Sequence, residues 1–279
     1  MNIKANAKIN LSLKVTGKRD DGYHLIDTVM HSVTLFDEIS IEKANEVTVE
    51  CDKYDIPQEQ NIAFKAANLF FDAANIKGGA KIKISKNIPA AAGLGGGSTD
   101  AAAVLLGLNS LYNANLCEQK LCEIALKLGA DVPFFIKGGC QRAEGIGEEL
   151  TPLKPLKSGH LLLAKADTKP STGEMYHLID SMPYETRDTK TVLTALENGD
   201  LSLLSKSLFN AFLSVWGESN LKQTLLGFSP LAVSLSGSGP TFFAIFEDLS
   251  QAENAQNALK EKGIDCWLAE FCDKAIIIE

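Results

Sequence analysis

The sequence predicts an α+β protein made of two halves, of about 150 and 120 residues. Residues 8–15 alternate between polar and apolar side chains, as a strand with one buried face does. Residues 89–97 are rich in glycine and lead into a helix-forming stretch. Residues 151–159 carry two prolines and turn polar, so we expect a linker there, between domains at 1–151 and 160–279.

In the first half, further strands are predicted over 26–36 and 39–49, with a hairpin turn near Asn45 and Glu46. Apolar residues then recur at helical spacing over 61–75, and Asn61 suits the N-cap of that helix. The remaining elements expected here are strands over 81–84 and 138–146 and helices over 98–112 and 118–128.

The second half repeats the same mixture of patterns. Short apolar runs flanked by turn residues predict strands over 160–166, 231–235, 241–246, 266–271 and 275–278. Helical periodicity predicts helices over 171–179, 189–197 and 249–262.

Composition excludes several classes of protein. With 45% hydrophobic and 22% charged residues, the chain of 279 residues is typical of a globular protein. Its net charge of −8 predicts no general nucleic-acid affinity, because phosphate backbones demand a positive surface. The apolar run at 101–108 falls far short of the roughly 18–20 residues that span a bilayer, so we expect no membrane association.

The N-terminal residues and the cysteines both bear on the compartment of the protein. Residues 1–6 lead into alternating polar and apolar positions, which is not the pattern of a signal peptide. The six cysteines show no Cys-x-x-Cys spacing and lie among apolar neighbours, which favours reduced, buried thiols over a metal site. We therefore expect a cytoplasmic protein, as a monomer or weak homodimer.

The glycine-rich segment is a candidate phosphate cradle. Glycines let backbone N–H groups approach an anion, and the following helix adds its positive N-terminal end. Ser98, Thr99 and Asp100 also suit the cap and first turn of that helix, which is their purely structural interpretation. The residues expected to bind the nucleotide are Pro89, Ala90, Ala91, Ala92, Gly93, Leu94, Gly95, Gly96, Gly97, Ser98 and Thr99.

The three commonest nucleotide folds do not fit this loop. A P-loop requires a lysine, and the loop contains none. A dinucleotide-binding fingerprint that started at Gly93 would need glycine where Ser98 stands. The His-Arg-Asp and Asp-Phe-Gly elements of protein kinases are absent from the sequence.

Separated segments instead resemble the GHMP kinase superfamily. They are Ala7-Lys8-Ile9-Asn10-Leu11, Lys18-Arg19-Asp20-Asp21-Gly22-Tyr23-His24, the loop 89–100, Gly129-Ala130-Asp131-Val132-Pro133-Phe134-Phe135 and Ser236-Gly237-Ser238-Gly239-Pro240-Thr241. Together they are most similar to the members that phosphorylate a cytidine diphosphate-linked sugar alcohol. Thr99 departs from the serine usual in that family but keeps the hydroxyl, and residues 171–176 fit its pattern more loosely.

The resemblance implies a fold and a chemistry. It implies a ribosomal protein S5 domain 2-like N-terminal domain that carries the ATP loop, a ferredoxin-like C-terminal domain, and an active site between them. It also implies ATP as co-substrate with Mg²⁺, for which Ser98, Thr99 and Asp100 are candidate contacts. The sequence does not choose among these three as the metal ligand.

The same resemblance assigns the catalytic residues. From the pattern alone, Asp131 is either a helix cap or a base beside a cleft, and Lys8 is a lysine on the polar face of a strand. The resemblance maps the family's catalytic aspartate onto Asp131 and its catalytic lysine onto Lys8. Asn10 shares the face of Lys8, so we expect it to hydrogen-bond the substrate.

Substrate selectivity is expected from aromatic and small residues. Tyr23 and His24 would give a cytosine ring a stacking face and an edge partner, and Tyr176 would close the other face. Ser238 and Gly239 lie in a loop of small residues that either lets the backbone approach the substrate or is a simple β-turn.

Two alternatives to this substrate remain open. One is another GHMP small-molecule kinase, of the mevalonate or homoserine type. The other is a non-catalytic nucleotide-binding module on the same fold, which should lack the lysine and the base. Both Lys8 and Asp131 are present, which argues against the second alternative.

Overall fold

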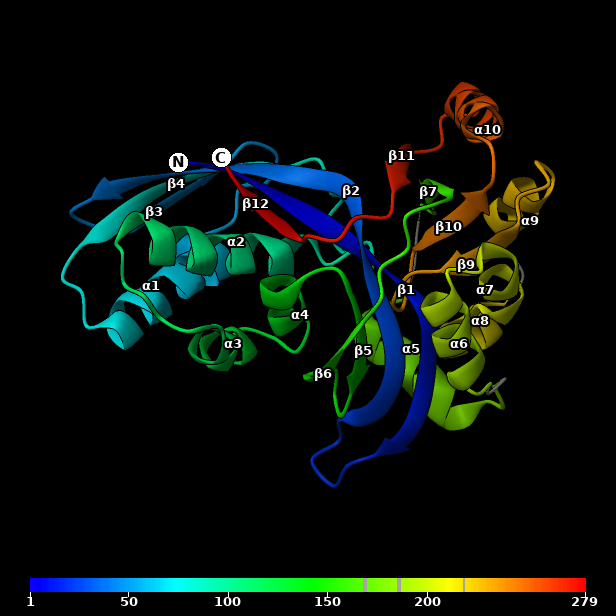
Figure 1. Ribbon diagram of the computed structural model, residues 1–279, viewed down its shortest axis with the longest axis horizontal. Helices are drawn as coiled ribbons and strands as arrows, with labels where there is room; N and C mark the ends of the chain where they lie inside the picture. Colours follow the sequence, from blue (N-terminus) through cyan, green and yellow to red (C-terminus); the bar gives the residue numbers. More distant parts are fainter. Residues whose placement is uncertain (168–169, 185–186, 218) are drawn as a thin grey trace.

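In the computed structural model the chain forms two sheets, each covered by helices (Figure 1). The structure describes residues 1–167, 170–184, 187–217 and 219–279. Among these residues, no helix is both long and apolar enough to cross a membrane. The predicted α+β class is confirmed.

The first sheet is built on two long antiparallel strands, β1 (Asn2–Lys18) and β2 (His24–Ala44). Its order is β12-β1-β2-β4-β3, and β5, β6 and β8 join at its side. These further strands are β3 (Thr48–Cys51), β4 (Gly79–Ser85), β5 (Cys140–Glu144), β6 (Glu149–Leu153), β8 (Phe209–Asn210) and β12 (Ile276–Ile278).

Three sequence predictions about this sheet are wrong. The strands expected over 26–36 and 39–49 are largely one continuous strand, β2. No hairpin joins β2 to β3 at Asn45 and Glu46, because β3 instead pairs parallel with β4. The linker expected over 151–159 starts later than predicted, because Pro152 lies inside β6. This strand is at the side of the sheet, where a strand can lack one N–H donor.

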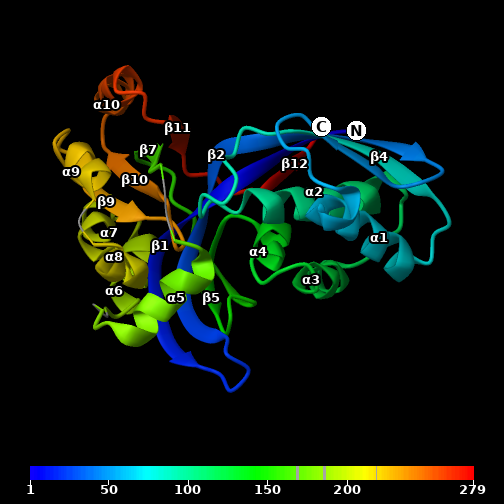
Figure 2. The same ribbon diagram turned by 180° about the vertical axis from the view of Figure 1, so that it is seen from behind.

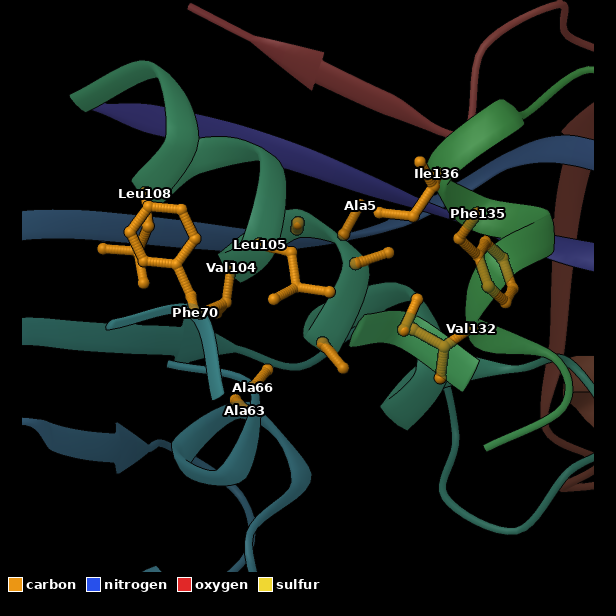
Figure 3. Close-up of a cluster of buried hydrophobic side chains, with 14 of the residues drawn as sticks. Ala5, Ala63, Ala66, Phe70, Val104, Leu105, Leu108, Val132, Phe135 and Ile136 are labelled. Atoms are coloured by element: carbon orange, nitrogen blue, oxygen red, sulfur yellow. The ribbon is translucent and has the colours of Figure 1, made fainter. Parts of the chain in front are cut away.

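Helices α1 (Ile62–Ala74), α2 (Gly96–Leu111), α3 (Glu118–Leu126) and α4 (Val132–Lys137) cover one face of this sheet (Figure 1). Asn61 caps α1 as predicted, since its side chain accepts from Ala63 N. Phe70, Leu105 and Phe135 bring α1, α2 and α4 into one buried cluster (Figure 3). Burying each such side chain stabilises the fold by about 1.5–3 kcal/mol.

The second sheet is antiparallel, in the order β11-β7-β10-β9. Its strands are β7 (His160–Lys165), β9 (Ala232–Leu235), β10 (Thr241–Phe246) and β11 (Cys266–Glu270). The helices of this half are α5 (Thr172–Ser181), α6 (Lys190–Asn198), α7 (Leu201–Ser207), α8 (Ala211–Trp216), α9 (Asn220–Leu226) and α10 (Leu249–Glu261). Of these, α7, α8 and α9 were not predicted from the sequence.

Both halves contribute to the surroundings of β1. The last strand, β12, returns to pair with β1, so the two termini lie together (Figure 1). The short strand β8 pairs parallel with the other end of β1. Seen from behind, α5 lies across β1 and the lower part of the first sheet (Figure 2). The parts of the chain before and after residues 151–159 therefore share contacts along β1.

Candidate active site

Two neighbouring cavities meet at the glycine-rich loop. The loop-side cavity, of about 540 Å³, is lined by this loop together with Tyr54, Asn61 and Ile62. The strand-side cavity, of about 430 Å³, is lined by side chains of β1 and β2 and by α5 and α8. Residues common to both linings are Ala91, Gly93, Gly95, Asp131 and Thr172. A molecule in one cavity can therefore lie in contact with a molecule in the other.

Backbone conformation explains two of the loop's glycines. Gly93 and Gly95 have φ of +76° and +75°, in the left-handed region that favours glycine. A Cβ on Gly93 would lie 2.2 Å from the carbonyl oxygen of Ser236, and one on Gly95 would lie 2.5 Å from Cζ of Phe135. Gly97 differs, because a Cβ there would make ordinary contact with Ile62 at 3.5 Å.

Most of the predicted nucleotide-binding residues line the loop-side cavity. Leu94 and Thr99 do not: Leu94 packs into the core, and the Thr99 side chain is fully buried. Helix α2 begins at Gly96, earlier than predicted, so its N-terminal turn is built on the glycines themselves. The unpaired N–H groups and the positive end of this helix thus lie at the cavity.

Asp131 lies at the junction of the two cavities, with Lys8 of the strand-side cavity beside it. Lys8 is only 4% exposed, and its Nζ lies 3.6 Å from Oδ2 of Asp131. Asp131 immediately precedes α4, yet within the described part of the chain its side chain forms no helix-capping hydrogen bond. The carboxylate is partly exposed, in the lining of both cavities. The geometry therefore favours the base over the helix cap.

Asn10 orients Lys8. Its Oδ1 accepts from Nζ of Lys8 at 2.7 Å and from the backbone N–H of Gly237 at 2.9 Å. Its Nδ2 donates to Oγ1 of Thr28 at 2.8 Å. Both lone-pair directions of the amide oxygen are thus already used, which leaves less capacity for the substrate contact predicted for Asn10.

The loop at residues 236–239 packs against the glycine-rich loop. Oγ of Ser236 donates to the carbonyl oxygen of Gly93 at 2.8 Å. Ser238 lines the strand-side cavity, with its Oγ 3.1 Å from Oγ1 of Thr172. Gly239 is not in that lining, and a Cβ on it would lie 2.5 Å from Trp216.

The three residues predicted to hold a nucleobase are only partly brought together. The rings of His24 and Tyr176 stack directly, with centroids 4.4 Å apart and planes 16° apart. No base fits between them at this distance. Tyr23 is 61% exposed and lines neither of the two cavities. Tyr176 lines the strand-side cavity, near Asp131.

Asp180, which the sequence analysis missed, holds His24 in this position. Its Oδ1 lies 2.7 Å from Nε2 of His24, and its Oδ2 accepts from Nζ of Lys18 at 2.5 Å. These two hydrogen bonds, that of His24 first, lower the pKa of Asp180 to about 2. Asp180 lies four residues after Tyr176, and this i, i+4 spacing on α5 was the available signal.

A buried cluster of Asp37, Lys86 and Asp100 was also missed. Nζ of Lys86 donates to both carboxylates, at 2.6 Å to Oδ2 of Asp100. Burial raises the pKa of Asp100 to about 8, although the charge of Lys86 opposes the shift. Burial also acts to lower the pKa of Lys86, but the two carboxylates outweigh it and raise that pKa. The signal in the sequence that could have revealed this cluster is Asp37, a charged residue within the otherwise largely apolar strand β2.

The residues present fit a Mg²⁺ ion that is carried by nucleotide phosphates. The described residues contain no group of three acidic, histidine or cysteine side chains that would hold a metal alone. Mg²⁺ commonly keeps waters and uses one or two protein oxygens plus substrate phosphates. Asp100 is paired with Lys86 and Thr99 is buried, so among the three predicted contacts Ser98 is the half-buried hydroxyl in the cavity lining.

Comparisons with known proteins agree with this architecture. The family described as GHMP kinases N terminal domain matches residues 61–139, and GHMP kinases C terminal matches residues 192–265. A crystal structure of 4-(cytidine 5'-diphospho)-2C-methyl-D-erythritol kinase superimposes with a TM-score of 0.79 at 32% identity, covering 97% of this chain and 99% of that one. A homoserine kinase from Cytophaga hutchinsonii, at 16% identity and a TM-score of 0.77, shares the fold.

Curated relatives are similar over almost their whole length. The 4-diphosphocytidyl-2-C-methyl-D-erythritol kinase of Clostridium perfringens (strain ATCC 13124) is 44% identical over 271 residues, which cover 94% of each chain. That of Acetivibrio thermocellus is 42% identical over 278 residues, covering 97% of this chain and 98% of the relative. The chain belongs to the 4-diphosphocytidyl-2-C-methyl-D-erythritol kinase family of the GHMP kinases.

Proposed function

We propose that this protein transfers the γ-phosphoryl group of ATP to the 2-hydroxyl of 4-diphosphocytidyl-2-C-methyl-D-erythritol, giving the 2-phosphate and ADP. The reaction belongs to the non-mevalonate route to isoprenoid precursors. Beside the similarity to the named relatives, one observation carries the proposal: Asp131 lines both cavities, and Lys8, in the lining of the strand-side cavity, lies 3.6 Å from it. A nucleotide in one cavity and an alcohol in the other would bring their reacting groups together there.

Asp131 would accept the proton of the attacking hydroxyl. Its carboxylate is partly exposed at the cavity junction, as a base that must reach a substrate has to be. The ammonium group of Lys8 lies 3.6 Å from this carboxylate and attracts it electrostatically, which would help to hold it in place. The same ammonium can stabilise negative charge on the transferred phosphoryl group, whose transition state is loose and depends on positioning and charge neutralisation.

The loop-side cavity would hold ATP. Backbone N–H groups of the glycine-rich loop and of the first turn of α2 are donors for the phosphates. Ser98 is the residue that would contact Mg²⁺ carried with the nucleotide, and the ion would supply positive charge to offset that of the phosphates. The strand-side cavity would hold the sugar alcohol, with Ser238 and Thr172 in its lining.

The cytidine group would lie against Tyr176, with Tyr23 and His24 as its other partners. Because His24 covers one face of Tyr176, the imidazole has to move if the base is to stack on that face. Tyr23 directly precedes His24, so a movement of His24 would also move the exposed ring of Tyr23.

The test is substrate choice. ADP release is measured with the cytidylyl substrate, with its uridylyl counterpart, with mevalonate and with homoserine. We expect turnover with the cytidylyl substrate to exceed the others by at least tenfold in kcat/KM, as expected when a polar edge of the substrate is read. Faster turnover of mevalonate or homoserine would assign the protein to that other type of GHMP kinase. Equal use of both bases would remove the cytidine assignment.

A further inference from the structure

Asn210, in the short strand β8, is a buried residue with every polar group of its side chain engaged. Nδ2 donates to the carbonyl oxygens of Leu235 at 2.8 Å and Gly237 at 2.9 Å. Oδ1 accepts from the backbone N–H of Phe212 at 2.9 Å. Because carbonyl oxygens only accept and a backbone N–H only donates, these partners fix the orientation of the amide.

Gly237 carries this arrangement to the first half of the chain. While its carbonyl oxygen accepts from Asn210, its N–H donates to Oδ1 of Asn10 at 2.9 Å. The same oxygen of Asn10 accepts from Nζ of Lys8 at 2.7 Å. A continuous series of hydrogen bonds therefore leads from Asn210 through Gly237 and Asn10 to the ammonium group at the cavity junction.

We propose that Asn210 is a positioning residue for phosphoryl transfer, acting on Lys8 through Gly237 and Asn10; this rests on the proposed function. Lysine has a flexible four-carbon stem, so its ammonium group has no fixed position of its own. Asn10 takes one of its three N–H groups, and Asp131 lies near at 3.6 Å. The other N–H groups of the ammonium are then available to contact the phosphoryl group as it transfers.

Without Asn210, the carbonyl oxygens of Leu235 and Gly237 lose this donor, and the loop at 236–239 loses one of the hydrogen bonds that hold it. The N–H of Gly237 then no longer holds Asn10, whose side chain is free to rotate away from Lys8. A displacement of about 1 Å in a catalytic group lowers the rate about a hundredfold. Nucleotide binding should change little, because neither Asn210 nor Gly237 lines the loop-side cavity.

Asn210 also caps helix α8 by accepting from Phe212, and the variants have to separate the two roles. In Asn210→Asp the carboxylate can still accept from Phe212 but cannot donate to Leu235 and Gly237. Asn210→Ser keeps a smaller cap without a second donor. Asp200→Ala is the matched control, since Asp200 caps α7 of the same half by accepting from Leu203 N at 2.8 Å and has no link to Lys8.

We expect Asn210→Asp and Asn210→Ser to lower kcat about ten- to a hundredfold with KM for ATP within about threefold of the parent. Asp200→Ala should lower the melting temperature but leave kcat unchanged. A double-mutant cycle tests the route: Asn10→Ala combined with Asn210→Ser should be no slower than Asn10→Ala alone. Multiplying effects, or a kcat in both Asn210 variants within twofold of the parent, would overturn the proposal.

Failure of this proposal is distinguishable from failure of the proposed function. If Lys8→Ala abolishes turnover while both Asn210 variants remain active, the positioning role is wrong and Lys8 keeps its role. If Lys8→Ala itself retains the parental kcat, the assignment of Lys8 is wrong, and the role of Asn210 falls with it.

Discussion

At the residue scale, burial changes what a charged side chain can do. Periodicity places Lys8 on the polar face of a strand, but the structure covers that face with the glycine-rich loop and the loop at 236–239. The buried ammonium group contacts Oδ1 of Asn10 and lies close to the carboxylate of Asp131. A charge held in this way interacts more strongly with a bound phosphate than an exposed charge would.

Asp131→Asn tests the base. The amide has nearly the shape of the carboxylate but cannot accept the proton, so kcat should fall by about 10²–10⁴-fold, the usual range for general base catalysis. ATP affinity, measured by calorimetry, should stay near that of the parent. Asp188→Asn is a control, because Asp188 is an exposed aspartate of the second half that accepts from Lys190 N. Near-parental kcat in Asp131→Asn would contradict the assignment.

His31 makes stability depend on pH. It is fully buried; its Nδ1 donates to the carbonyl oxygen of Ser32, and its Nε2 accepts from Leu156 N at 2.9 Å. Burial lowers the pKa of His31 to about 4 from the ordinary value of 6.5. The neutral ring is therefore favoured in the folded state, and its contribution is complete above pH 6.5 and is lost as the pH falls towards 4.

The loss amounts to about 3 kcal/mol of the free energy of unfolding. Urea unfolding at pH 7 and pH 4 measures it, with His31→Gln as the comparison, since glutamine offers an acceptor but does not titrate. The parent should lose more stability than the variant over this range. An equal loss in both proteins would show that other groups cause the pH dependence.

At the element scale, α2 and the loop before it form one unit. The left-handed conformation of Gly93 and Gly95 lets the chain pass between Phe135 and the loop at 236–239 before the helix starts at Gly96. Glycine is needed there by the backbone, whereas at Gly97 only the approach of a ligand would require it.

Gly95→Ala and Gly97→Ala separate these two requirements. Gly95→Ala puts a Cβ 2.5 Å from Phe135 at positive φ, so we expect both a lower melting temperature and weaker ATP binding. Gly97→Ala should leave the melting temperature unchanged, because its Cβ makes ordinary contact at 3.5 Å. Weaker ATP binding in Gly97→Ala would then come from blocked phosphate approach. Unchanged nucleotide affinity in both variants would place the phosphates elsewhere.

The features that could be predicted from the sequence are those that depend on residues close together along the chain. The cap at Asn61, the glycine-rich loop and the strand over residues 8–15 have local signals, and the structure contains all three, although the strand begins earlier, at Asn2. The short elements α7, α8 and β8 have few residues and weak periodicity, so they were missed. Asp180 and Asn210 were missed for a different reason: the partners that matter to the site, His24 for Asp180 and Leu235 and Gly237 for Asn210, lie more than 20 residues away along the chain.

At the scale of the whole molecule, the first half carries the two side chains proposed to react, and the second half lines part of the strand-side cavity. Lys8 and Asp131 belong to the first half, whereas α5 brings Thr172 and Tyr176 to the strand-side cavity. Asp180 fastens α5 to Lys18 and His24 of the first half. This division predicts that side chains of the two cavities govern different Michaelis constants.

Tyr176→Ala and Tyr54→Ala are expected to have opposite effects on the Michaelis constants of the two substrates. Tyr176 lines only the strand-side cavity of these two, and Tyr54 only the loop-side cavity. Loss of one stacked aromatic ring costs about 1–3 kcal/mol per base, so Tyr176→Ala should raise KM for the cytidylyl substrate about ten- to a hundredfold with little change for ATP. Tyr54→Ala should raise KM for ATP instead, and Tyr23→Ala should follow Tyr176→Ala. If Tyr176→Ala and Tyr54→Ala raised the same constant, the assignment of one cavity to each substrate would be wrong.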